Sequence, residues 1–248
     1  ALAYGNTVVF KPAELVPGCA WALAEIISRS GLPAGAFNLV LGSGRRVGQT
    51  IVESPLVDAI SFTGSVPVGE ALLATATARR ARVQLEMGGK NPLVVLADAA
   101  LERAVEHAIQ GAFYSTGQRC TASSRIIVEA PVFDRFASLM RQRTAALVVG
   151  HALERGTQIG PVVSADQLAQ DLSYVDIGRN EGAEWLCGGE ALERPTRGHY
   201  MSPALWLAEP QHRIAREEIF GPLACVLRAD DYEHALALAN DTPFGLCA

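Results

Sequence analysis

Hydrophobic and polar positions in the first third of the chain alternate between two periodicities. Short apolar runs predict buried strands at 7–10, 37–41, 57–62 and 83–86. Segments with helical spacing separate them and end near residues 30, 53 and 79. Pro17 stands where a first helical turn tolerates proline. Strands that alternate with helices predict parallel pairing with right-handed crossovers.

The rest of the chain continues this pattern less regularly. Asp98 is expected to be the N-cap of a helix from Ala99 to Tyr114. Trp206 is expected in the core because its neighbours are apolar. The other expected elements are strands at 92–96, 125–129 and 224–227, helices at 131–148, 164–182 and 232–240, and loops or a hairpin crossing at 149–161 and 194–203. The pattern as a whole predicts an α/β fold in which the strand at 92–96 starts a second unit.

Composition narrows the class of protein. The chain has 248 residues, 49% hydrophobic and 19% charged, which is typical of a globular enzyme. A net charge of −5 argues against a nucleic-acid partner. No apolar run reaches membrane-spanning length and no signal peptide is visible, so we expect no membrane association. Five cysteines without a CxxC pair favour a reducing, cytoplasmic compartment and argue against disulfides or a metal site.

Glycines and charged residues follow the expected strands. In parallel sheets, ligands bind at the carboxyl ends of the strands, where glycines let backbone amides approach a phosphate. The candidates are Lys11, Glu14, Gly42, Gly44, Gly64 and Ser65. Gly42, Gly44 and Gly48 form GxGxxxG, one residue longer than the dinucleotide fingerprint, and glycine turns in any α/β sheet can produce this spacing. Lys11 and Glu14 are, by themselves, more typical of solvated surface charges.

Two residues in the middle of the chain have the chemistry of a nucleophile and a base. Cys120 stands in FYSTGQRCTASSR (113–125), between an expected helix and an expected strand. A thiol is partly ionised at neutral pH, and the adjacent Arg119 would favour the thiolate. Glu86 ends a strand before two glycines, so its carboxylate could activate a water. Taken alone, such a cysteine is more typical of a small buried residue. Glu86 taken alone is equally typical of a solvated loop carboxylate.

Five motifs together resemble the aldehyde dehydrogenase superfamily. EMGGKNP (86–92) and FYSTGQRC (113–120) are similar to its two active-site signatures. KPAE (11–14), FTGS (62–65) and EEIFGP (217–222) follow the family's order and lie close to its spacings. The resemblance covers the whole chain, whereas the chain covers about the middle half of the usual family length. We therefore expect a piece of a longer protein.

The resemblance implies a role for each matching residue. Cys120 would be the nucleophile and Glu86 the base. Lys11 and Glu14 resemble the pair that holds the adenosine ribose, and Glu218 resembles the residue that binds the nicotinamide ribose. The other cofactor-binding candidates match the family's pyrophosphate and nicotinamide positions or the glycine turn: Gly44, Phe62, Gly64, Ser65, Gly69, Met87, Gly88 and Phe220.

The implied activity is the oxidation of a small-molecule aldehyde to a carboxylate with NAD or NADP. A thiolate adds to the aldehyde, hydride passes to the nicotinamide, and a water activated by Glu86 hydrolyses the remaining thioester. STGQRCTASSR and DLSYVDIGRNEGA most resemble dehydrogenases of 2-oxoglutarate semialdehyde (2,5-dioxopentanoate). Glu14 would repel the 2′-phosphate of NADP, although Arg45 and Arg46 could offset this.

Two other interpretations stay open. The family's oxyanion-binding asparagine lies upstream of residue 1, so this chain alone could be a catalytically silent fragment. A relative that passes its acyl group to coenzyme A is the third possibility, and Glu86 argues against it because such enzymes need no hydrolytic base. The resemblance implies that residues 1–88 are part of a Rossmann-like dinucleotide-binding domain. Residues 89–248 would be a catalytic domain that carries the thiol and is incomplete at its C-terminal end. The full-length protein is expected to be a homo-oligomer.

Overall fold

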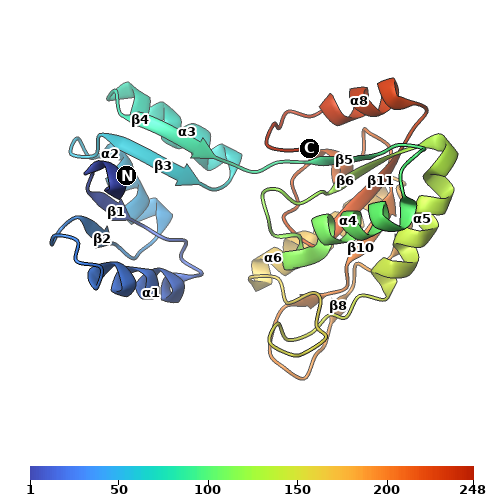
Figure 1. Cartoon of the computed structure of the whole chain (residues 1–248), viewed down its shortest axis with the longest axis horizontal. Coiled ribbons are helices and arrows are strands. Elements are labelled where there is room, and N and C mark those ends of the chain that lie inside the picture. The colour runs from blue at the N-terminus through green and yellow to red at the C-terminus, as the bar shows by residue number, and fades with distance from the viewer. The chain divides into compact units, whose positions relative to one another are not determined.

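The computed structural model describes residues 1–248 and divides into two compact units, Ala1–Met87 (unit 1) and Gly88–Ala248 (unit 2). Figure 1 shows that each unit has its own strands and helices. The division lies one residue before the boundary expected from the sequence. No helix in the structure combines the length and the apolar character needed to cross a lipid bilayer.

Unit 1 contains two parallel strand pairs connected by helices. Strand β1 (Val8–Phe10) pairs with β2 (Phe37–Leu39), and β3 (Ala59–Thr63) pairs with β4 (Arg82–Glu86). The connecting helical segments are η1 (Leu2–Tyr4), α1 (Pro17–Ser28), the π-helical turn η2 (Gly44–Gly48), α2 (Gln49–Glu53) and α3 (Val66–Ala78). The predicted alternation of strands and helices and the parallel pairing are confirmed here.

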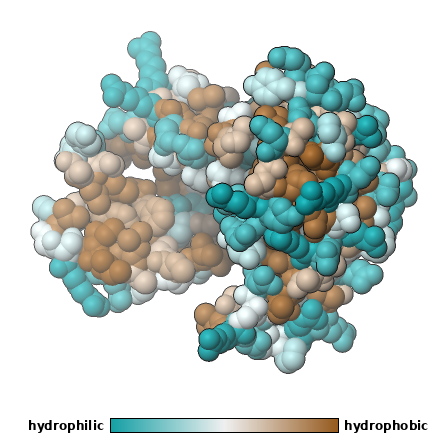
Figure 2. Space-filling view, turned by 45° about the vertical axis from the view of Figure 1, so that its right-hand side comes forward, coloured by the Kyte–Doolittle hydropathy of each residue, from teal (hydrophilic) through white to brown (hydrophobic).

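The surface of unit 1 has exposed hydrophobic side chains on helix α1. Trp21 is 59% exposed and Ile26 is 68% exposed. Only Ala20 of this helix is buried. Figure 2 shows hydrophobic colour over unit 1. Helix α1 is therefore apolar on its solvent side as well as where it contacts β2.

Unit 2 is built on one five-stranded sheet in the order β5-β6-β11-β10-β7. Its strands are β5 (Pro92–Val95), β6 (Arg125–Glu129), β11 (Leu223–Ala229), β10 (Ala204–Leu207) and β7 (Glu184–Cys187). The first four are mutually parallel, whereas β7 is antiparallel to β10. Parallel pairing was expected only for the first third of the chain, and β7 and β10 were not expected as strands.

Side chains alternate between two buried layers on the sheet of unit 2. Ile126 and Val226 pack with helices α4 (Leu101–Phe113) and α5 (Ala130–Ala145) on one face. On the other face, Ile127 and Trp206 pack with α6 (Ala165–Asn180), α7 (Arg213–Arg216) and α8 (Tyr232–Asn240). This alternation is what the twofold period of a strand requires when both faces are covered. Trp206 is fully buried, which confirms its predicted place in the core.

Local details of unit 2 differ from the sequence expectations. Helix α4 begins at Leu101 with Ala100 at its N-cap and without a side-chain cap, so Asp98 does not cap it. Of the expected loop or hairpin crossing at 194–203, the hairpin alternative agrees with the structure: β9 (Tyr200–Met201) pairs antiparallel with β8 (Ala191–Leu192), which lies just before that segment. The 3-10 turn η3 (Tyr114–Gly117) follows α4 and leads the chain toward Cys120.

Candidate functional site

The turn before Cys120 has an unusual backbone. Ser115, Thr116 and Gly117 have φ angles of 57°, 59° and 65°, in the left-handed region. Non-glycine residues rarely occupy this region, and such conformations cluster at functional sites. Cys120 itself is exposed. Cys120 is therefore not one of the buried cysteines of this chain, which are Cys187 and Cys225.

Two side chains fix the backbone around Cys120. The Asn91 amide donates to the carbonyl oxygens of Cys120 (2.7 Å) and Ala122 (3.1 Å). Arg119 donates to the carbonyl oxygens of Gln110 (2.9 Å) and Gly111 (3.2 Å) in the last turn of α4. Arg119 was expected to support the thiolate by its charge. That expectation stays a prediction, and the hydrogen bonds of Arg119 anchor the residues before Cys120 to the helix end, where carbonyl groups lack partners within the helix.

Asn91 lies in the EMGGKNP motif and was not expected to have a functional role. It is only 3% exposed, and its side-chain oxygen accepts a hydrogen bond from the Cys247 amide at 3.3 Å. One buried amide thus connects the glycine-rich motif to the carbonyl of the candidate nucleophile. The signal in the sequence that could have found it was its place in the motif that also contains Glu86. Buried asparagine side chains usually have their hydrogen bonds satisfied, as those of Asn91 are here.

We expect Asn91→Ala to lower the free energy of unfolding of the protein by about 2 kcal/mol or more, because two carbonyl groups would lose their donor. Activity should fall as well, since the Cys120 loop would no longer be held. Urea unfolding and steady-state kinetics measure the two effects. Asn240→Ala is the matched control, because Asn240 is exposed and bonds only within its own helix. Equal stability losses in the two variants would contradict the role given to Asn91.

A second loop, residues 217–222, lies against the Cys120 turn. A side chain at Gly117 would overlap the carbonyl oxygen of Gly221, so the two loops touch through backbone atoms. Phe220 has a φ of 60°, another left-handed non-glycine residue. The two loops line a cavity of about 20 Å³, together with Gly89. The motifs FYSTGQRC and EEIFGP are thus neighbours in unit 2.

Glu218 is half-buried beside the first glycines of unit 2. The Gly89 amide donates to its carboxylate at 3.2 Å, and a side chain at Gly88 would overlap that carboxylate. Burial raises the pKa of Glu218, while the Gly89 hydrogen bond and the charge of Lys90 act in the opposite direction. Residue 88 must therefore be glycine for Glu218 to reach this position, which links two of the predicted cofactor residues.

Glu217, the neighbour of Glu218, is held by other partners. Arg213 donates to both of its carboxylate oxygens, at 2.8 and 3.0 Å, and the Tyr174 hydroxyl donates to it at 2.7 Å. The Arg213 hydrogen bond lowers the pKa of Glu217. Burial, followed by the contact with Glu217, raises the pKa of Tyr174 to about 12. Glu217 therefore anchors the loop, and Glu218 is the member of the pair that faces Gly88 and Gly89.

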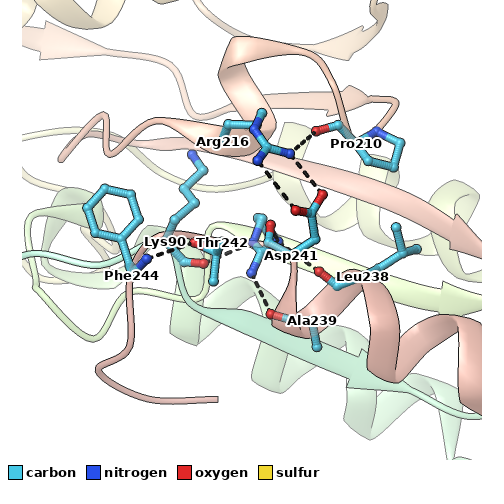
Figure 3. Close-up of polar contacts among 9 residues, drawn as sticks. Lys90, Pro210, Arg216, Leu238, Ala239, Asp241, Thr242 and Phe244 are labelled. Carbon is cyan, nitrogen blue, oxygen red and sulfur yellow. Dashed lines mark hydrogen bonds and ion pairs between the residues drawn. The ribbon is translucent and has the colours of Figure 1, made fainter.

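Buried basic groups lie beneath this region of unit 2 (Figure 3). Arg125 donates to the carbonyl oxygens of Lys90 (2.9 Å), Leu238 and Ala239 (both 3.0 Å) and so joins β6 to the end of α8. The Lys90 ammonium group is buried without a hydrogen-bond partner, and burial lowers its pKa to about 8. Arg125 thus fixes the backbone at Lys90 and at the end of α8.

Unit 1 brings Glu14 and Gly44 together, with Lys11 in the same KPAE motif. The Gly44 amide donates to the Glu14 carboxylate at 2.8 Å, and the Lys11 ammonium donates to the carbonyl of Pro12 at 2.7 Å. Glu14 lines a cavity of about 180 Å³ with Gly42 and Ser43. The KPAE motif and the GxGxxxG turn therefore form one solvent-open hollow, although they are about thirty residues apart in the sequence.

A second group of candidates in unit 1 gathers at the start of α3. The Phe62 ring covers Gly64, and the Met87 side chain lies so close to Gly69 that a Cβ there would be 2.5 Å from the Met87 sulfur. Ser65 is the N-cap of α3, but its side chain caps no amide. The free amides of the first turn can bind an anion at this position, where the helix dipole favours negative charge.

Glu86 is the last residue of β4 and its side chain is exposed. Gln84, two residues earlier on the same face, donates to its carboxylate at 2.7 Å. Exposure leaves the Glu86 carboxylate accessible to water, as the sequence suggested. Each unit thus gathers its own candidates, those from Lys11 to Met87 in unit 1 and those from Gly88 to Phe220 in unit 2.

Comparisons with known proteins agree with the motifs. The profile of the aldehyde dehydrogenase family matches residues 1–248. The chain is 48% identical to the alpha-ketoglutaric semialdehyde dehydrogenase of Bacillus subtilis and 44% identical to the betaine aldehyde dehydrogenase of Sinorhizobium fredii. Each match covers 100% of this chain and 51% of the relative. The chain thus spans about half the length of the curated relatives that it matches.

Solved structures show the same fold. The HpcC protein of Thermus thermophilus matches with a TM-score of 0.96 at 43% identity, over 99% of this chain and 49% of that one. The betaine aldehyde dehydrogenase of Staphylococcus aureus, solved in complex with NAD+, matches with a TM-score of 0.97 at 34% identity, over 99% and 50%. The resemblance and the fold predicted from the sequence are confirmed, and the chain belongs to the aldehyde dehydrogenase family.

Proposed function

We propose that this chain carries the thiol and much of the cofactor site of an enzyme that oxidises an aldehyde to a carboxylate. Unit 1 would bind the dinucleotide and unit 2 would carry the nucleophile. The observation that carries the proposal is the Cys120 loop, in which an exposed thiol follows three left-handed residues and is fixed by buried Asn91. A fixed, accessible thiol is what covalent catalysis on a carbonyl carbon requires.

In the proposed mechanism, the Cys120 thiolate adds to the aldehyde carbon and a thiohemiacetal oxyanion forms. The Cys120 amide donates no hydrogen bond within the chain, so it is free to donate to this oxyanion. Departure of hydride leaves a thioester on Cys120. Glu86, exposed at the end of β4, takes a proton from the water that hydrolyses the thioester, and the carboxylate product leaves.

NAD or NADP, when bound, supplies the hydride acceptor. The residues present fit such a group. The hollow beside Glu14 and Gly44 is open to a ribose, and the uncapped start of α3 at Ser65 suits a pyrophosphate. Glu218 and Phe220 would contact the nicotinamide half. The exposed Glu14 carboxylate would repel a 2′-phosphate, which favours NAD over NADP.

We infer a semialdehyde substrate, with 2-oxoglutarate semialdehyde as the leading candidate. The 48% identity to a relative that is named for this substrate supports the choice. Betaine aldehyde is the second candidate substrate, supported by the 44% identity to a betaine aldehyde dehydrogenase. A chain that is silent by itself, and a relative that passes its acyl group to coenzyme A, are the competing possibilities.

Initial-rate measurements on the whole protein test the proposal. We expect NADH to form with 2-oxoglutarate semialdehyde at a kcat/KM at least about tenfold above that for betaine aldehyde, and NAD to be preferred over NADP. Coenzyme A should not raise the rate, because Glu86 supplies the base for hydrolysis. A rate that depends on coenzyme A, with an acyl-coenzyme A product, would overturn the hydrolytic mechanism. Reversed specificity for the two aldehydes would overturn the substrate.

A further inference from the structure

Helix α6 contains a fully buried carboxyl group that no charged side chain pairs with. Asp171 is 0% exposed. Gln167 donates to one of its oxygens at 2.8 Å, and the other oxygen has no partner. Burial raises the pKa of Asp171 to about 7. An isolated buried carboxylate is costly, so the uncharged form of Asp171 suits this position.

The charged side chains that face the 217–222 loop act on Glu217 and Glu218, and the Lys90 ammonium, which has no hydrogen-bond partner of its own, acts on both of these carboxylates. Across from Asp171, Glu217 is bound by Arg213 and Tyr174, and Glu218 accepts from the Gly89 amide. On α6 itself, Asp176 is exposed and pairs with Arg179. No cation is therefore placed to stabilise an ionised Asp171, and its charge state depends on burial and on Gln167 alone.

Asp171 lies directly against the loop that carries Glu218 and Phe220. A side chain at Gly221 would overlap both carboxyl oxygens of Asp171, so the carboxyl group fills the space beside Gly221. Gln167 and Gln170 both donate to the carbonyl oxygen of Ile219, at 3.1 and 2.8 Å. Gln170 and Asp171 follow Gln167 by three and four positions, so both lie beside it on the helix surface.

The same loop touches the Cys120 turn on another side. The Gly221 carbonyl lies against Gly117, three residues before Cys120. Residues 217–222 are thus held between the polar face of α6 and the turn that presents the thiol. A change at Asp171 can reach both the candidate ribose contact, Glu218, and the backbone beside Cys120.

We propose that Asp171 is a positioning residue for the cofactor site: its uncharged carboxyl group holds the 217–222 loop through Gly221, and its ionisation loosens that loop and weakens dinucleotide binding. This proposal rests on the proposed function.

Because the folded protein binds the proton more tightly than the unfolded chain, the contribution of Asp171 to stability is full below the ordinary aspartate pKa and is lost as pH rises through about 7. Loosening of the loop is therefore expected above neutral pH.

The first test compares Asp171→Asn with the parent in the whole protein. The amide retains the size and hydrogen-bonding capacity of the carboxyl group but cannot ionise. We expect the Kd for NADH, measured by fluorescence titration, to rise about fivefold or more from about pH 6 to about pH 9 in the parent, and to change much less in Asp171→Asn. Asp176→Asn, on the exposed side of the same helix, should retain the parent's pH dependence. Equal pH profiles in the parent and in Asp171→Asn would overturn the proposal.

A second measurement needs no cofactor and no variant. Amide hydrogen exchange of residues 217–222, corrected for the intrinsic effect of pH, should lose protection above neutral pH, while helix α5 does not. Unchanged protection of 217–222 across this range would overturn the role of Asp171 even if Asp171→Asn fails to fold. A protein that binds no NADH at any pH would refute the proposed function, whereas the exchange result would still decide the role of Asp171.

Discussion

Cys120→Ser should abolish NADH formation, with kcat/KM falling by roughly 10⁴-fold or more. A hydroxyl is almost un-ionised at neutral pH, and no base lies within hydrogen-bond contact of residue 120 to activate it. The loop itself should be unchanged, because its hydrogen bonds from Asn91 and Arg119 involve backbone atoms. Stopped-flow and steady-state kinetics on the whole protein, with NADH dissociation constants measured in parallel, would separate lost chemistry from lost binding.

Cys247 provides a matched control for this substitution. It is also an exposed cysteine, its sulfur lies 4.0 Å from the carbonyl oxygen of Thr121, and its amide donates to Asn91. Its thiol has no role in the proposed chemistry, so Cys247→Ser should retain activity within about twofold. Full activity in Cys120→Ser would show that Cys120 is not the nucleophile. If Cys247→Ser were inactive in the same experiment, Cys247 would be the nucleophile instead.

Glu86→Gln should separate the two halves of the reaction. The thiohemiacetal can still form and lose hydride, so one equivalent of NADH per site should appear in a burst. Hydrolysis of the thioester should then slow by about 10²–10⁴-fold, the usual contribution of a general base. Mass spectrometry of the quenched protein should show an acyl group on Cys120.

The comparison for Glu86→Gln is Glu25→Gln in the same unit. Glu25 is exposed on α1 and pairs only with Arg29, so its loss should leave turnover unchanged. Normal steady-state turnover by Glu86→Gln would remove Glu86 from the mechanism. A missing burst with intact NADH binding would place its role before hydride departure instead of after it.

Several sequence expectations failed where packing or a specific contact decided the outcome. The segments Glu184–Cys187 and Ala204–Leu207 became strands because each found a neighbour in the five-stranded sheet, and neither has a strong local alternation. Asp98 stands close to a helix start without capping it, since α4 begins at Leu101. The hydrogen bonds of Arg119 to the carbonyl groups at the end of α4 were not expected. In each case the deciding partner lies at a distance along the chain or in a neighbouring element.

In the candidate site too, the sequence identified residues whose contacts only the fold shows. Glu14 and Gly44 were both chosen from glycine and charge patterns, but only the fold shows that one binds the other. Asn91 and Asp171 were missed, because a buried amide and a buried carboxyl group look like ordinary polar residues in a sequence. Their importance comes from what surrounds them: Cys120 and Ala122 carbonyls for Asn91, and the space beside Gly221 for Asp171.

The sequence by itself determined the family, the alternation of strands and helices, and the identity of the reactive thiol and carboxylate candidates. It could do so because period, glycine turns and short motifs are local properties of the chain. Only the tertiary structure decided which side chains hold the Cys120 and 217–222 loops and which carboxyl group is buried without a charge partner. Desolvation and long-range hydrogen bonds arise from packing between distant segments, and no local pattern specifies them.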